Sequence, residues 1–145
     1  MREFNVKWNV TEDDYTFLEK ETKLYPLYKK KLREAIDDII YSTPERDTNG
    51  GGRSSEISRP TERIAFNLTE DARIMWLKRF IDCVEFAYNE LEEEKQRFIQ
   101  EIFWTHTTKT KKKICKDFAI STTTYDRWKK GFLLRVGLLT GIKRD

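Results

Sequence analysis

The residues best suited to specific chemistry lie in the segment KKKICKDFAISTTTYDRWKK, residues 111–130. Lysine and arginine side chains occur near both of its ends, and a run of hydroxyl side chains from Ser121 to Thr124 lies between them. Cationic groups bind phosphate oxygens, while hydroxyl and guanidinium groups can hydrogen-bond to the edges of bases. The segment therefore carries the side chains of a surface that binds nucleic acid.

Apolar residues in the same segment follow the spacing of a helix-turn-helix, in which two short helices cross steeply over a small shared core. Counted from Lys111, the fourth, eighth, tenth, fifteenth and eighteenth places should be apolar, and they hold Ile114, Phe118, Ile120, Tyr125 and Trp128. The fifth place must be small and is Cys115, and the ninth, where glycine is preferred at the turn, is Ala119. This pattern predicts a helix-turn-helix over residues 110–139, with its aromatic side chains in the core.

Local chemistry supports both predicted helices. Thr110 and Ser121 precede them, and each hydroxyl could cap its helix by accepting a backbone amide hydrogen bond. Side chains from the start of the second helix would reach base edges in the major groove, where Arg127 could pair with guanine. Lysines at the start of the first helix would meet phosphates. The predicted DNA-binding residues are Lys109, Lys111, Lys112, Ser121, Thr122, Thr123, Thr124, Asp126, Arg127, Lys129 and Lys130.

Positive charge is concentrated in this C-terminal part of the chain. The full sequence of 145 residues has a net charge of +3. Residues 106–145 hold eleven basic and three acidic residues, a net charge of +8, which leaves −5 for the rest. An acidic body with a compact basic segment is typical of proteins that bind polyanions.

Other kinds of site lack the residues that they need. The two cysteines, Cys83 and Cys115, have no close partner, and His106 is the single histidine. We therefore predict reduced thiols and no metal, cofactor or catalytic residue. No apolar run approaches the length of a membrane span, and the N-terminus lacks a signal-peptide core. The sequence favours a soluble, cytoplasmic protein that is not an enzyme and has no membrane partner.

Helical periodicity dominates the rest of the chain, and no segment alternates as a strand would. The predicted helices cover residues 11–23, 27–41, 61–68, 70–91 and 92–103. Thr11, Thr61 and Thr69 are the expected caps, and the Tyr25-Pro26 step is an expected break. In the long helix, one stripe is expected to be buried: Ile74, Leu77, Ile81, Val84, Tyr88 and Leu91. The fold class predicted is all-α.

A glycine-rich stretch, DTNGGGRSSEISRPT at residues 47–61, interrupts these helices. It lacks the preceding strand and the lysine spacing of a nucleotide-binding loop, so it is interpreted as a connector. The alternative is that Arg53 contacts the DNA backbone. The expected domains are an N-terminal helical arm at 1–46, a hinge loop at 47–60, and a helical body with the helix-turn-helix at 61–145.

Four stretches together resemble phage late-transcription activators of the RinA/ArpU type. They are the glycine-rich stretch, the long helix after it, EEEKQRFIQEIFW, and ISTTTYDRWKK with its closing LLTGI, and the resemblance covers roughly residues 20–142. The C-terminal part is also similar to region 4 of sigma factors. The resemblance implies a regulator of phage packaging and morphogenesis genes in Gram-positive hosts, with Ser121–Phe132 as the recognition helix. Thr122 and Thr123 stand where such proteins often carry arginine, so the operator is expected to differ.

Expected partners are double-stranded DNA at a promoter or operator, host RNA polymerase, and a second copy of the chain. A lone helix-turn-helix discriminates poorly, and paired half-sites are the usual remedy, which suggests a homodimer with residues 70–91 as candidate surface. Two alternatives remain open at this point. One is a DNA-packaging recognition subunit, similar to a small terminase, and the other is an adaptor that docks on polymerase without binding DNA.

Overall fold

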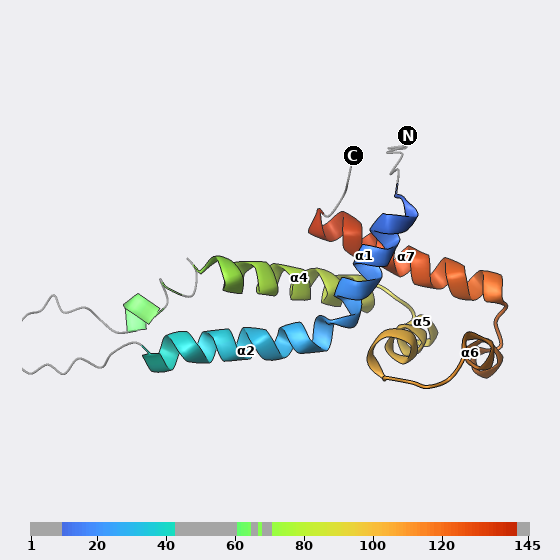
Figure 1. Ribbon diagram of the computed structural model, residues 1–145, viewed down its shortest axis with the longest axis horizontal. Helices are drawn as coiled ribbons and strands as arrows, with labels where there is room; N and C mark the ends of the chain where they lie inside the picture. The colour runs from blue at the N-terminus through green and yellow to red at the C-terminus, as the bar shows by residue number, and fades with distance from the viewer. Residues whose placement is uncertain (1–9, 43–60, 65–66, 68–70, 142–145) are drawn as a thin grey trace, which may run out of the picture. The chain divides into compact units, whose positions relative to one another are not determined.

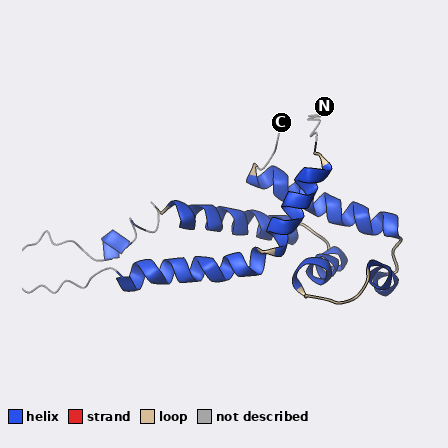
Figure 2. Cartoon of the chain, in the orientation of Figure 1, coloured by secondary structure: helices blue, strands red, loops and turns tan. Residues whose placement is uncertain are grey.

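The structure, a computed structural model, describes residues 10–42, 61–64, 67 and 71–141. Every regular element in these ranges is a helix, so the predicted all-α class is confirmed (Figure 2). The elements in Figure 1 are α1 (Glu12–Lys23), α2 (Tyr25–Ser42), α4 (Ala72–Asn89), α5 (Glu93–Ile99), the π-helical η1 (Gln100–Trp104), α6 (Lys111–Phe118) and α7 (Thr122–Thr140). Among the described helices, none combines the length and the apolar character needed to cross a bilayer.

The chain forms two compact units. The first combines Met1–Pro26 with Asp82–Asp145, and the second is Leu27–Ile81. Within the described residues, α1 therefore belongs with the C-terminal helices, whereas the sequence suggested a single N-terminal arm. The expected hinge at 47–60, including Arg53, lies outside the described residues, so the three-part division of the chain stays a prediction.

Helix α1 begins where the sequence predicted. The backbone amide of Asp14 donates to the hydroxyl of Thr11, and the amide of Thr11 donates to the carboxylate of Asp14, which together form a capping box. The helix buries Leu18 and Thr22. It packs across α7, which brings the two ends of the described chain together in one unit (Figure 1).

Two helix starts differ from the expected positions. The break between α1 and α2 is at Leu24, and α2 begins at Tyr25, so Pro26 lies inside its first turn. Proline is tolerated there because the first amides of a helix have no intrahelical acceptor. The start of α4 is capped by Asp71, whose carboxylate accepts from the amides of Arg73 and Ile74. Thr69, the expected cap, lies outside the described residues.

The core of the first unit gathers side chains from α4, α5, η1 and α7. Its most buried members are Val84, Phe98, Ile99, Leu133 and Val136. The indole of Trp104 links η1 to α1, because its Nε1–H donates a hydrogen bond to the backbone carbonyl of Thr22 at 2.8 Å. The π-helical turn that carries Trp104 was not predicted, since the sequence favoured a continuous helix.

The second unit pairs α2 with the first part of α4. Tyr28 packs edge-on against Trp76 and Phe80, whose rings stack on each other with centroids 5.6 Å apart. Ala35, Ile74, Leu77, Phe80 and Ile81 are buried. The predicted apolar stripe of the long helix is thus already covered within the chain from Ile74 to Val84, while Tyr88 and Leu91 are half-buried.

Candidate nucleic-acid interface

The last two helices lie where the helix-turn-helix was predicted. Thr110 and Ser121 cap α6 and α7, since their hydroxyls accept from the amides of Lys113 and Thr124 at 3.2 and 3.1 Å. Ala119 adopts the left-handed conformation (φ 54°, ψ 45°). Its amide donates to the carbonyl of Lys116, and that of Ile120 donates to Cys115, which ends α6 with its last carbonyls satisfied. The chain then turns directly into α7.

The turn residue gives a testable prediction about stability. A left-handed conformation costs an L-residue about 1–2 kcal/mol, and glycine avoids this cost at the expense of greater freedom in the unfolded chain. Ala119→Gly is therefore expected to raise the free energy of unfolding by about 0.5–1 kcal/mol in urea titrations. A decrease in stability would show that the alanine methyl group makes contacts that the turn needs.

The two helices are held against α5 by an aromatic cluster. The ring of Phe98, which is completely buried, lies edge-on to Phe118, Tyr125 and Trp128 with centroid distances of 5.7, 5.2 and 5.3 Å. These three aromatic residues are thus directed into the core, as their spacing predicted. Ile114 and Cys115 are buried as well. Because α5 supplies the centre of this cluster, it positions both helices of the motif.

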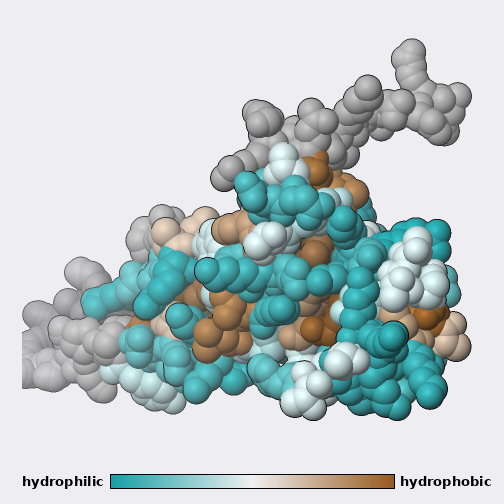
Figure 3. Space-filling view, turned by 45° about the vertical axis from the view of Figure 1, so that its right-hand side comes forward, coloured by the Kyte–Doolittle hydropathy of each residue, from teal (hydrophilic) through white to brown (hydrophobic). Residues whose placement is uncertain are grey.

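The exposed face of α7 carries the predicted polar residues. Thr122, Thr123, Asp126, Arg127 and Lys130 are exposed. Hydrophilic residues cover much of the surface visible in Figure 3, with hydrophobic areas between them. The hydroxyl of Thr124 is half-buried and accepts from Ser121 and from the guanidinium of Arg127 at 3.3 Å. Ser121 and Thr124 are therefore engaged in the cap, and they hold Arg127 beside the start of the helix.

Ion pairs occupy four of the five predicted lysines. Lys109 contacts Glu101 and Asp117 at 3.2 and 3.1 Å, and Lys111 contacts Asp126 of α7 at 2.8 Å. From α1, Glu19 contacts Lys129 at 2.9 Å and Glu12 contacts Lys130 at 3.4 Å. The hydrogen bond that Lys111 donates to Asp126 raises the pKa of Lys111, and those that Lys109 donates to Asp117 and Glu101 raise the pKa of Lys109. Phosphate that binds these lysines would either replace a carboxylate or use a remaining N–H of the ammonium group, which has three donors.

Two lysines of α6, Lys112 and Lys116, are not engaged in this way. They are exposed, lie one turn apart on α6, and have no ion pair among the described residues. Lys112 was predicted to contact DNA, whereas Lys116 was not, because it lies beyond the first turn of α6, where free backbone amides favour phosphate. The spacing of four residues from Lys112, opposite the buried Ile114 and Cys115, is the signal that could have found it.

The pairing of α1 with α7 predicts a dependence of stability on pH. Burial opposes ionisation of Glu19, but hydrogen bonds and charges from Lys129 and Lys23 outweigh it, so its pKa lies below the ordinary value of 4.5. A lowered folded-state pKa stabilises the fold above the unfolded-state value, and this contribution is lost as the pH falls through the folded-state value. Glu19→Gln should therefore cost at most about 1 kcal/mol near neutral pH and nothing well below pH 4.5. A cost that is equal at both pH values in urea titrations would contradict this role.

Taken together, these features define a helical protein whose capped helix pair presents a polar, basic face on an aromatic core. The family described as Protein of unknown function (DUF722) matches residues 27–136. The chain is also similar to the transcriptional activator rinA of Staphylococcus phage phi11, with 31% identity over 121 residues that cover 82% of this chain and 84% of the relative. The chain belongs to the RinA-like family of phage activators, as its motifs indicated. No solved structure matches it.

Proposed function

We propose that this chain is a transcriptional activator that binds double-stranded DNA sequence-specifically through α6 and the first turns of α7. The observation that carries the proposal is a capped helix pair with four exposed polar residues, Lys112 and Lys116 on α6 and Thr123 and Arg127 on α7. The name of the phage phi11 relative supports activation. The target we propose is a promoter of phage packaging and morphogenesis genes, in the cytoplasm of the bacterial host.

Each of these four exposed residues has a proposed role that follows from its position. Arg127 and Thr123 lie on the early turns of α7, from which a recognition helix reaches base edges, and Arg127 is suited to guanine. Lys112 and Lys116 would contact phosphates from α6. Lys111 and Lys130 would join them when phosphate oxygens replace Asp126 and Glu12 as their partners.

A second candidate function is the adaptor that docks on RNA polymerase without binding DNA. The ion pairs of Lys109, Lys111, Lys129 and Lys130 favour it, because they neutralise much of the positive charge around α7. The two functions differ in whether the remaining lysines bind duplex DNA. A packaging subunit would also bind DNA, but it would form a ring-shaped oligomer.

The test uses the double variant Lys112→Ala, Lys116→Ala and a duplex of mixed sequence. Each phosphate contact contributes about 0.9 to the slope of log affinity against log salt, so the slope should fall by about 1.8 between roughly 50 and 200 mM salt. Lys30→Ala with Arg33→Ala removes the same charge from exposed positions of α2 and should leave the slope unchanged. Equal slopes for all three proteins would place DNA contact elsewhere, and no binding by any of them would favour the adaptor.

A further inference from the structure

Five residues form an exposed stripe along α2. Leu27, Lys31, Glu34, Asp38 and Tyr41 are spaced by four, three, four and three residues, so they lie on one face of the helix. All five are exposed, and the two apolar members are open to solvent by 41% for Leu27 and 82% for Tyr41. This α2 stripe is apolar at its ends and charged in the middle.

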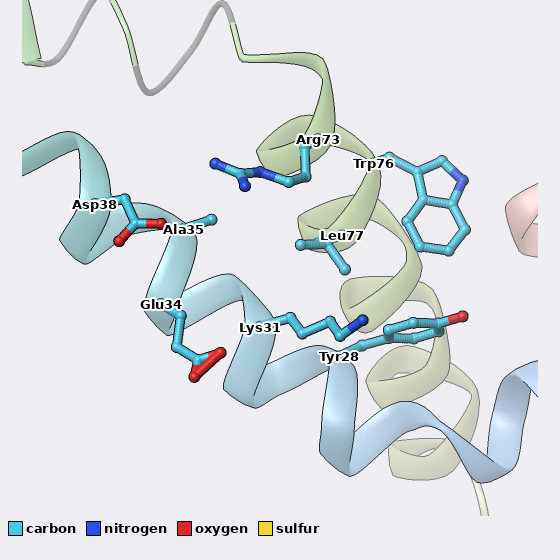
Figure 4. A pocket seen from close by; sticks show the side chains of 8 residues that line it. All are labelled: Tyr28, Lys31, Glu34, Ala35, Asp38, Arg73, Trp76 and Leu77. Atoms are coloured by element: carbon cyan, nitrogen blue, oxygen red, sulfur yellow. The ribbon is translucent and has the colours of Figure 1, made fainter.

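The α2 stripe borders a groove between α2 and α4 (Figure 4). From α4, Arg73 extends into this groove, and the indole of Trp76 is 46% exposed although one face stacks on Phe80. Large aromatic side chains left open beside a groove are typical of interaction surfaces. The pair of helices α2 and α4 therefore exposes apolar surface that the core of the second unit does not cover.

The order of charges in the α2 stripe makes it complementary to itself in one orientation. Leu27 and Tyr41 are each seven residues from Glu34, and Lys31 and Asp38 are three and four residues from it. An antiparallel copy centred on Glu34 would thus place Leu27 opposite Tyr41, and Lys31 one residue, or about 1.5 Å, out of register with Asp38, which is within reach of their side chains. A parallel copy would place Lys31 opposite Lys31 and Asp38 opposite Asp38, which charge repulsion disfavours.

The guanidinium of Arg73 can offset the charge repulsion at the centre of the antiparallel pair. Two glutamates, Glu34 from each copy, would approach the two-fold axis, where like charges repel. Arg73 lines the same groove as Glu34 and Asp38, so each copy brings a guanidinium to the acidic middle of the stripe. On the α4 side of the groove, Trp76 supplies apolar area that a stable dimer would bury.

We propose that the α2 stripe and the groove beside it bind a second copy of this chain, as an antiparallel, two-fold symmetric homodimer. From the predicted dimer surface at residues 70–91, this proposal uses Arg73 and Trp76, while the apolar stripe from Ile74 to Val84 is buried within the chain. The role that we give to this dimer rests on the proposed function, because two copies would present two recognition helices to paired half-sites. Its existence is tested without DNA.

The experiment measures the mass of the full-length chain by sedimentation equilibrium. The wild type should approach twice the 17.5 kDa of one chain. Lys31→Glu and Asp38→Lys should each raise the dimer dissociation constant about tenfold, because every substitution turns two symmetry-related attractive pairs into repulsive ones. The double variant restores opposite charges in swapped positions, and it should return the dissociation constant to within a few-fold of the wild type. Arg33→Glu, exposed on another face of α2, is the matched control.

Three outcomes would overturn the proposed dimer. A wild-type chain that stays monomeric excludes the dimer, and a dimer that is indifferent to both single charge reversals uses another surface. Single variants that weaken the dimer without recovery in the double variant would show that Lys31 and Asp38 do not face each other. Circular dichroism must show that all variants keep their helix content. A dimer that fails to bind duplex DNA would contradict the proposed function alone, whereas a monomer that binds DNA would contradict the dimer alone.

Discussion

Replacement of Phe98 by alanine is expected to lower the free energy of unfolding by about 3–5 kcal/mol, a large part of the roughly 5–15 kcal/mol that is usual for a native protein. Phe98 is completely buried, and its ring touches Phe118 of α6 and both Tyr125 and Trp128 of α7. Its removal leaves a cavity at the point where three helices meet. Loss of the ring would therefore weaken the packing of α6 and α7 against α5.

Thermal or urea unfolding, followed by circular dichroism, measures this effect. Phe17→Ala is the matched control, since it removes the same ring from an α1 position that is 48% exposed and should cost about 1 kcal/mol or less. A cost for Phe98→Ala as small as that of the control would mean that the aromatic cluster does not position the two helices. Phe98→Leu keeps most of the buried volume and should recover part of the lost stability.

Replacement of Arg127 by alanine should weaken binding to the preferred operator by about 1–3 kcal/mol, or roughly 5- to 150-fold. Arg127 is exposed on the early part of α7 and is held there by Thr124. A guanidinium that contacts a guanine edge contributes to the recognition of one base pair. The variant should therefore accept other bases at one operator position while keeping its preference at the rest.

A comparison with a lysine of α6 tests whether Arg127 contacts a base rather than a phosphate. Lys112→Ala should weaken binding to every sequence alike, because a phosphate contact carries no base information. Binding profiles of the two variants across single-base operator changes distinguish the cases. If Arg127→Ala weakens binding equally on all sequences, Arg127 contacts a phosphate and another residue of α7 reads the base.

Local features of the fold could be predicted from the sequence because short-range chemistry determines them. Thr11, Thr110 and Ser121 cap their helices through hydroxyl bonds to amides three residues ahead. The spacing of Phe118, Tyr125 and Trp128 identified the side of the motif that packs inward. The left-handed turn at Ala119 was anticipated from the preference for glycine at that place, although the residue itself is unfavourable there.

Features that depend on distant parts of the chain could not be predicted. Lys130 and Glu12 are 118 residues apart, and nothing local indicates that α1 lies against α7. The sequence does not indicate that Glu12 and Glu19 of α1 pair with Lys130 and Lys129 of α7. For the same reason, four of the five lysines predicted to contact DNA are paired within the chain, and the fifth, Lys112, lies on α6.

The measurement that tests the central claim most directly is selection of bound duplexes from a random pool by the full-length chain, near physiological salt. The salt concentration must be stated, because phosphate contacts alone produce apparent affinity at low ionic strength. We expect an enriched sequence, with two spaced half-sites if the chain acts as the dimer inferred from α2. Recovery of DNA without any enriched sequence, or no recovery at all, would contradict sequence-specific binding by α6 and α7.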